Sequence, residues 1–261
     1  MGTANVAAGR RWRFGVWSVA LLLLIGTRAA AQQPPVPPKP VWDLKLGLSY
    51  LATTGNTGTS SAGIDANYRQ VWGPWSLEGA AAAVQATRND EETAENYHIQ
   101  LRSQRKVADT LQLTAGLKGE RNRFAGIDYR TILDTSLRWS LLDSPLLKVH
   151  TLSGLSWTRE EPRGERPFDD SFGALVQING LAKLSPTAEF NSQITTYPDL
   201  ENTGDYRING HLGIQAALNA HLALRLGYEL RYDNEPVRGF ERTDTTSTAS
   251  LVVQLGRKGH G

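Results

Sequence analysis

The sequence predicts an all-β protein: a closed antiparallel up-and-down transmembrane β-barrel of about 12 strands, with short periplasmic turns and long extracellular loops. Three observations predict this fold class. Apolar and polar residues alternate with a period of two, the connections between the alternating segments are short and long in turn, and aromatic residues collect near the segment ends. From residue 42 onwards, no stretch has the 3.6-residue period of an amphipathic helix.

The period of two is clear at both ends of this region. Leu44, Leu46 and Leu48 alternate with polar or small residues, and Leu224 and Leu226 do the same. Because successive side chains of a strand point to opposite faces, each segment has one apolar and one polar face. Twelve segments follow the pattern: residues 42–53, 60–72, 75–88, 95–107, 110–122, 129–142, 146–158, 171–184, 187–197, 205–218, 222–233 and 243–256.

The connections between these segments fall into two length classes that alternate along the chain. The short ones lie at residues 73–74, 108–109, 143–145, 185–186 and 219–221. The long ones lie around residues 55–56, 90–92, 125–126, 161–170, 199–204 and 234–242. An up-and-down barrel with both termini on the short-turn side gives this order, and closure leaves no strand edge unpaired.

Alternation alone does not decide which face of the barrel meets water. Twelve strands enclose more space than side chains can fill, because about eight strands already give a filled interior. The apolar face carries small residues that would fill a wide lumen badly: Ala81, Ala83, Ala174, Ala182 and Ala249. We therefore expect the apolar face to contact lipid and the polar face to line the lumen.

The aromatic residues support this orientation, because membrane barrels carry two interfacial girdles of Tyr and Trp. The group expected near the short-turn end is Trp42, Trp72, Trp75 and Trp139. The group expected near the long-loop end is Tyr50, Tyr97, Tyr129, Trp157, Phe172, Tyr197, Tyr206, Tyr228 and Tyr232. Few aromatic residues lie at mid-strand, which the general preference of aromatics for strands does not explain.

Composition excludes several classes of protein. The chain has 261 residues, and its mean hydropathy of -0.37 excludes a bundle of membrane helices. The absence of cysteine excludes disulfides, thiol nucleophiles, thiolate metal sites and a lipid-modified N-terminal cysteine. Without four arginines near the N-terminus, 24 basic residues face 26 acidic ones, so no basic patch indicates a nucleic acid partner.

The N-terminal segment has the three parts of a secretory signal peptide. Arg10, Arg11 and Arg13 precede an apolar run over residues 14–25, and Ala29-Ala30-Ala31 supplies a cleavage site. The predicted organisation is a cleaved signal peptide over 1–31, a proline-rich periplasmic tether over 32–41, the barrel over 42–256 and a disordered tail over 257–261. The location predicted for the mature chain is the cell outer membrane.

Three segments resemble one family of Gram-negative proteins, the salt-induced outer-membrane proteins built on a domain of unknown function. The segments are Gly55-Asn56-Thr57, residues 120–130 with the sequence ERNRFAGIDYR, and the hairpin formed by residues 228–233 and 243–245. The likeness covers about residues 42–256 and implies an outer-membrane β-barrel, but no molecular activity. The last strand ends in Leu255-Gly256, whereas such barrels usually end on an aromatic residue, which bears on recognition by the assembly machinery.

The first functional hypothesis is a small pore or a structural envelope-stress barrel without catalysis. The candidate lumen-lining charges are Arg102, Lys118, Glu120, Asp134, Arg138, Arg207, Arg225, Glu229 and Arg231. Mixed charges across a lumen can set ion selectivity, or they can pair and plug the barrel; both alternatives stay open. The expected partners are outer-membrane lipid and lipopolysaccharide, the outer-membrane assembly machinery, and small solutes or ions.

Two further hypotheses come from the long-loop end. A hydrolase acting on lipid or lipopolysaccharide could use His98, with Asp90, Glu91, Glu92 and Glu95 near it in sequence, but no Gly-x-Ser-x-Gly or His-Glu-x-x-His motif occurs. We expect no catalytic residue, cofactor or metal site. A surface binder or adhesin could use the charged loop at residues 159–170. The family motif at Gly126, Asp128, Tyr129 and Arg130 predicts a turn, with a functional role for Asp128 or Arg130 as the alternative.

Overall fold

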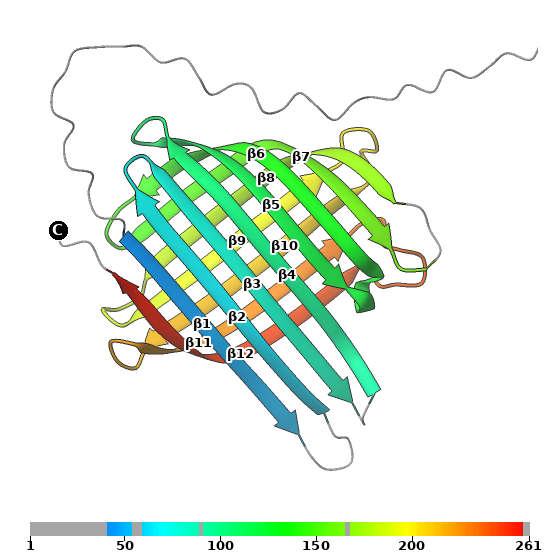
Figure 1. Ribbon diagram of the computed structural model, residues 1–261, viewed down its shortest axis with the longest axis horizontal. Helices are drawn as coiled ribbons and strands as arrows, with labels where there is room; N and C mark the ends of the chain where they lie inside the picture. The colour runs from blue at the N-terminus through cyan, green and yellow to red at the C-terminus, as the bar shows by residue number, and fades with distance from the viewer. Residues whose placement is uncertain (1–40, 54–58, 89–90, 165–167, 258–261) are drawn as a thin grey trace, which may run out of the picture. The chain divides into compact units, whose positions relative to one another are not determined.

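The computed structural model describes residues 41–53, 59–88, 91–164 and 168–257, which form one closed barrel (Figure 1). Each strand pairs antiparallel with its neighbours in the chain, and β1 pairs with β12 to close the ring. The strands are β1 (Val41–Thr53), β2 (Thr59–Trp72), β3 (Trp75–Arg88), β4 (Glu91–Lys106), β5 (Leu111–Asn122), β6 (Ile127–Asp143), β7 (Leu147–Pro162), β8 (Asp169–Lys183), β9 (Ala188–Pro198), β10 (Tyr206–Ala217), β11 (Leu222–Asp233) and β12 (Thr243–Arg257). The predicted fold class and strand number are confirmed.

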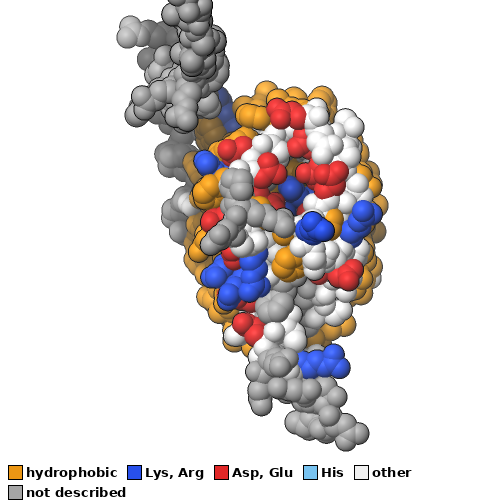
Figure 2. All heavy atoms as spheres, turned by 90° about the vertical axis from the view of Figure 1, so that its right-hand side faces the viewer, with side chains coloured by type: hydrophobic (Ala, Val, Ile, Leu, Met, Phe, Trp, Pro, Cys, Tyr) orange, Lys and Arg blue, Asp and Glu red, His pale blue; other side chains and the backbone are white. Residues whose placement is uncertain are grey.

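The outer wall of the barrel is apolar and the interior is polar. Leu48, Ile99 and Leu226 keep 60%, 63% and 54% of their surface exposed on the outside. Most buried side chains of the described residues are polar, so the barrel has the inverse pattern of a water-soluble protein. Figure 2 views the barrel from the right-hand side of Figure 1 and shows apolar side chains around its circumference, with charged and other polar side chains gathered in the middle. This apolar wall is suited to contact lipid.

The aromatic residues occupy both ends of the outer wall, with one exception. Trp72 and Trp139 are exposed near the short-turn end, and Tyr129 and Phe172 are exposed near the long-loop end. Tyr197 does not belong to the outer girdle, because its side chain lines the interior cavity. It shares the parity of the inward residues of β9, so the prediction for this tyrosine was wrong.

Two predicted connections differ from the structure because strands run further than expected. β4 begins at Glu91, so Glu91 and Glu92 belong to a strand and no long loop separates β3 from β4. A single 3-10 turn, η1 (Arg123–Ala125), joins β5 to β6, and Gly126 ends it with a φ of 77°. The turn prediction holds for Gly126 but is wrong for Asp128, Tyr129 and Arg130, because β6 already begins at Ile127.

The ends of the chain are only partly described. The predicted signal peptide over residues 1–31, the tether up to residue 40 and the tail from residue 258 lie outside the described residues. Val41 is the first residue of β1, and Arg257 is the last residue of β12. Within the part of the chain that the structure describes, no helix is long and apolar enough to cross a bilayer.

Candidate functional site

The barrel encloses a cavity of about 900 Å³ that is lined by inward side chains of its strands. The lining reaches from Asp43 and Glu78 near the short-turn end to Asp244 near the long-loop end. Asp43 and Asp244 are about 12 positions apart along the paired strands β1 and β12, which is roughly 30 Å of barrel height at the usual strand rise and tilt. Spread over roughly 30 Å, this volume has a mean cross-section of roughly 30 Å². The cavity is therefore long and narrow.

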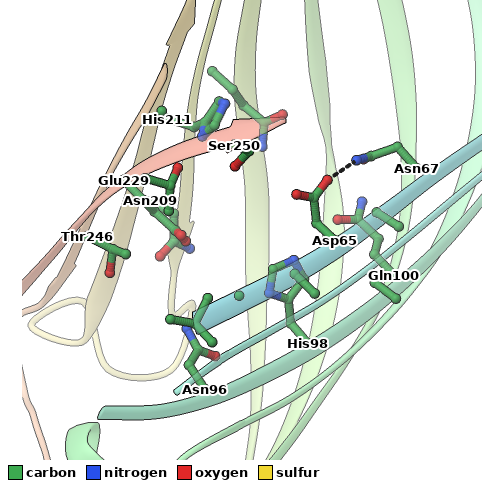
Figure 3. Close-up of a pocket in the computed structure, with 18 of the residues that line it drawn as sticks. Asp65, Asn67, Asn96, His98, Gln100, Asn209, His211, Glu229, Thr246 and Ser250 are labelled. Carbon is green, nitrogen blue, oxygen red and sulfur yellow. Dashed lines mark hydrogen bonds between the residues drawn. The ribbon is translucent and has the colours of Figure 1, made fainter. Parts of the chain in front are cut away.

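The cavity lies off-centre in the barrel because the two sides of the lumen are filled differently. On β3 the inward residues include Ala80 and Ala82, which leave space in front of the wall. On the opposite side, Leu152 of β7 and Leu175 of β8 are buried at 2% and 0% exposure and fill the interior. Figure 3 shows the open part, where side chains of β2 and β4 face those of β10, β11 and β12 across the space.

One wall of the lumen is held by a buried ion pair between β4 and β6. Arg102 donates two hydrogen bonds of 2.7 Å to the carboxylate of Asp134, and its guanidinium also donates to Thr114 at 3.1 Å. The pair passes directly over Gly116 of β5, where a Cβ atom would collide with both partners. Both side chains are almost fully buried, so removing either one would leave a charge uncompensated.

A second ion-pair network crosses the lumen at the long-loop end. Arg130 of β6 contacts Glu120 at 3.0 Å, Glu160 at 2.6 Å and Asp233 at 3.5 Å. Arg207 of β10 contacts Glu160 at 3.3 Å and Asp233 at 3.1 Å. These contacts join β5, β6 and β7 to β10 and β11, which stand on the other side of the ring. The network narrows the interior on this side without closing the cavity.

All nine predicted lumen charges point into the barrel, and eight of them, all except Arg138, form ion pairs. Besides the contacts above, Lys118 contacts Glu120 at 2.6 Å, Arg225 contacts Asp65 at 2.5 Å and Arg231 contacts Glu229 at 2.9 Å. Arg138 donates to Gln104 at 2.8 Å and is 3.2 Å from the Nδ1 atom of His150. Which charged residues pair with one another cannot be read from the alternation, because most partners are far apart in the sequence.

The sequence analysis missed two partners in the network across the lumen. Glu160 was assigned to the charged external loop, but β7 continues to Pro162 and turns this carboxylate inward. Its spacing of two and four residues from Thr158 and Ser156, which are both buried, is the signal that would have found it. Asp233 was taken as a strand end, although it has the same parity as Glu229 and Arg231.

The hydrolase hypothesis names acidic partners near His98 in sequence, and the two of them whose side chains are described, Glu92 and Glu95, contact other residues. Glu95 points to the outer wall, where it contacts Arg123 at 3.0 Å and Arg121 at 3.8 Å. Glu92 accepts a hydrogen bond from Gln85. The side chains of Asp90 and Glu91 lie outside what the structure describes. His98 itself faces the cavity, as Figure 3 shows. No group of three or more His, Asp or Glu that could hold a metal ion occurs among the described residues.

The adhesin hypothesis rests on the charged loop between β7 and β8, which is only partly described. Arg159 and Asp170 are 3.7 Å apart at its base. Arg163 donates its backbone N–H to the carbonyl of Gly126 at 2.7 Å, so the beginning of this loop is attached to the β5–β6 turn. Residues 165–167 lie outside the described part of the chain.

The family motif combines a turn with the first residues of β6. The side chain of Asn122 accepts a hydrogen bond from the backbone N–H of Ala125 at 3.1 Å and caps η1. Tyr129 is exposed on the outer wall with the guanidinium of Arg121 5.7 Å from its ring centre. Arg130, by contrast, is buried in the lumen network. The motif therefore fixes a turn at Gly126 and places one arginine inside.

Comparison with known proteins gives low similarity to solved outer-membrane barrels. An outer membrane channel from Pseudomonas putida F1 has 11% identity and a TM-score of 0.48, over 85% of this chain and 96% of that chain. The NanC porin has 11% identity and a TM-score of 0.45, over 82% of this chain and 97% of that chain. The translocator domain of the autotransporter NalP from Neisseria meningitidis has 12% identity and a TM-score of 0.42, over 84% and 88%.

Sequence comparison gives a firmer relationship. The uncharacterized protein YdiY of Escherichia coli (strain K12) is 25% identical over 233 residues, which cover 85% of this chain and 86% of that protein. A family model matches residues 46–255, nearly the whole barrel. The resemblance predicted from the three sequence segments is thereby confirmed. The chain belongs to the family described as "Protein of unknown function, DUF481".

Proposed function

We propose that this protein is a narrow, passive channel of the cell outer membrane, delivered by a cleaved signal peptide and carrying its proline-rich tether in the periplasm. The observation that carries the proposal is the polar cavity of about 900 Å³, whose lining extends from the short-turn end of the barrel to the long-loop end. A barrel that served only as a structural plug would need no such space. The apolar outer wall would contact outer-membrane lipid and lipopolysaccharide.

The arrangement of the charges supports a channel over a plug. The largest ion-pair network links β5, β6 and β7 to β10 and β11 and is buried, whereas the inward residues of β3 at mid-height, Ala80 and Ala82, are small and uncharged. Charges that pair on one side of a lumen stiffen that wall and leave the other side for water. A mean cross-section of roughly 30 Å² admits water, ions and small solutes but not a folded polypeptide.

Single-channel recording in a planar lipid bilayer tests the proposal. The purified full-length mature protein is expected to give discrete conductance steps, because water fills the polar cavity. A matched pair of variants identifies the path of the current. Thr248 lines the cavity and Ala249 is exposed on the outer wall. Thr248→Trp is expected to reduce the conductance several-fold, and Ala249→Trp to leave it unchanged.

Two outcomes would overturn the channel. A correctly folded barrel that gives no steps at any voltage would leave a structural or binding role. Steps that Thr248→Trp does not alter would mean that the current does not pass through this lumen. Folding of each variant is checked beforehand by the shift in electrophoretic mobility that a closed barrel shows before and after boiling.

A further inference from the structure

We infer that the lumen is selective for small neutral solutes rich in hydroxyl groups, such as monosaccharides, over anions and cations of similar size. The inference rests on the proposed channel and names the class of solute that it would pass. Two features of the lining carry it: the cavity's lysines and arginines are paired, and most of its other polar groups between the two ends are amides and hydroxyls.

Every lysine or arginine that lines the cavity has an acidic partner within 4 Å. The pairs are Lys45–Glu189, Arg69–Glu78, Arg102–Asp134, Lys118–Glu120, Arg225–Asp65 and Arg231–Glu229. A paired charge has a short-ranged field, so these arginines and lysines form no continuous ladder along which an anion could move. With these partners, the six basic side chains of the lining are neutralised, and the lining keeps only the two negative charges of Asp43 and Asp244 outside the pairs.

The two acidic residues outside these pairs stand at opposite ends of the cavity. Asp43 lies near the start of β1, and Asp244 lies near the start of β12 at the long-loop end. Neither forms an ion pair with another described residue. Their position at the ends would give at most a weak preference for cations and would disfavour entry of anions.

Between the ends, most of the groups that face the cavity outside the ion pairs are amides and hydroxyls, and they come from both sides of the ring together with the imidazoles of His98 and His211. Figure 3 shows Asn96 and Gln100 on one side, with Asn209 and Thr246 facing them on the other. Amides carry both donors and acceptors, so they can exchange hydrogen bonds with hydroxyl groups of a solute without a favoured sign of charge.

The physical reason for the preference is the cost of desolvation in a narrow passage. An ion that loses part of its hydration shell needs compensating charges, and in this lumen those charges are already engaged with one another. A sugar loses hydrogen bonds to water instead, and amide and hydroxyl groups replace them one for one. The free-energy cost of entering the lumen is therefore smaller for a neutral hydroxylated solute than for an ion.

Two measurements on the same proteoliposome preparation test the inference. The zero-current potential across a bilayer with a KCl gradient is expected to correspond to a cation-to-anion permeability ratio within about threefold of one. In liposome swelling, glucose is expected to enter faster than glucuronate, which has nearly the same size and one negative charge. A strong preference for either ion, or faster entry of glucuronate, would overturn the inference while leaving the channel itself intact. Absence of both conductance and swelling would overturn the proposed channel instead.

A pair of variants tests whether the pairing of charges in the lumen determines its ion selectivity. Arg231→Gln leaves Glu229 without its partner and is expected to shift the zero-current potential toward cation selectivity. Glu229→Gln leaves Arg231 and is expected to shift it in the opposite direction. The matched control is Asp109→Asn, an almost fully exposed turn residue that pairs with Lys106 at 2.8 Å and is expected to shift nothing. If both lumen variants leave the potential unchanged, the pairing does not set the selectivity and the inference is wrong.

Discussion

The ring of Phe240 packs directly against Gly126, although the two residues come from opposite sides of the barrel. A Cβ atom at position 126 would lie 2.7 Å from the Cδ2 atom of Phe240 and 2.9 Å from the Cβ atom of Val237. Gly126 follows η1 between β5 and β6, whereas Phe240 belongs to the connection between β11 and β12. Because these strand pairs stand opposite each other in the ring, residues 234–242 reach across the long-loop end. The glycine of the family motif is thus a contact point between two loops.

Substitution of Gly126 should release the β11–β12 connection from this contact. Gly126→Val would collide with Phe240 and Val237, and valine disfavours the positive φ of 77° by about 1–2 kcal/mol. We expect faster trypsin cleavage after Arg238 or Arg242 in the folded barrel, measured by mass spectrometry.

The control for this prediction is Gly164→Val. Gly164 also has a positive φ, of 100°, but no atom of the described residues lies within 4 Å of a Cβ atom placed there, so the variant has a similar backbone strain without a described contact to lose. Equal cleavage after Arg238 in the wild type and Gly126→Val would show that the contact does not restrain the loop.

The pair of Arg225 and Asp65 should stabilise the closure of the barrel. Their 2.5 Å contact connects β11 to β2 and so crosses β12 and β1, the two strands whose pairing closes the ring. Asp65→Asn leaves Arg225 largely buried without its carboxylate. We expect a loss of about 2–3 kcal/mol in the free energy of unfolding, measured by guanidinium titration with tryptophan fluorescence in detergent micelles.

A surface ion pair provides the comparison for the closure. Lys148 and Asp143 are 2.6 Å apart with side chains that remain about half exposed or more. Because exposed pairs contribute little, Lys148→Gln is expected to change the free energy of unfolding by less than about 1 kcal/mol. If Asp65→Asn and Lys148→Gln have the same small effect, the contact across the closure does not hold the barrel together.

A charge on the outer wall should be far more costly than the same charge one residue further along the strand. Ile99 of β4 is 63% exposed on the outside, and Gln100 faces the lumen. Ile99→Arg is expected to lower the stability of the barrel in phospholipid vesicles by about 2–4 kcal/mol, because the guanidinium would lie in hydrocarbon. Gln100→Arg should cost much less, since its charge meets water. Similar losses for both variants would contradict an apolar wall in contact with lipid.

The ionisation of the carboxyl group of Asp205 should reduce the stability of the barrel at neutral pH. Asp205 precedes β10 in a loop at the long-loop end, and burial raises the pKa of its carboxyl although Arg207 lies 3.7 Å away. Since the folded protein holds this proton more tightly than the unfolded chain, ionisation opposes folding. The contribution of Asp205 to stability is therefore lost as the pH rises from the ordinary Asp pKa through the raised one.

Asp205→Asn removes this ionisable group. We expect the variant to be more stable than the wild type at pH 7.5 and to lose this advantage below about pH 2.5, where the carboxyl group of the wild type is neutral in both the folded and the unfolded chain. Guanidinium unfolding at the two pH values measures the difference. The control, Asp199→Asn, lies in the same loop, where its carboxylate accepts two backbone hydrogen bonds, and it should gain nothing at pH 7.5. A wild type that is as stable as Asp205→Asn at neutral pH would show that burial of this carboxyl costs nothing.

Much of the fold could be predicted from the sequence because the physical signal repeats twelve times. The alternation at Leu44, Leu46 and Leu48 fixes which side chains share a face, whatever the neighbouring strand is. The strand boundaries were predicted wrongly where a strand continues into a segment rich in charged residues, a composition typical of loops. Glu91 and Glu160 were assigned to loops because charged residues surround them, yet backbone pairing with β3 and β6 extends the strands through both positions.

The candidate site could be predicted only in part. Parity placed the side chains of Arg102, Arg225 and Glu229 in the lumen, and the structure has them there. The partner of each charge depends on how far neighbouring strands are shifted against one another, and the sequence does not state that shift. Arg225 and Asp65 are 160 residues apart in the chain, and only closure of the ring makes them neighbours.

By itself, the sequence determined that this chain forms twelve strands, each with one apolar face. The alternation of apolar and polar residues is local, and each strand carries it independently of the others. Tertiary structure decided which charges neutralise one another, which loop rests on Gly126 and where the open space lies. These depend on strand register and on the volumes of residues from opposite walls, such as Ala82 and Leu175, which meet only when the ring closes.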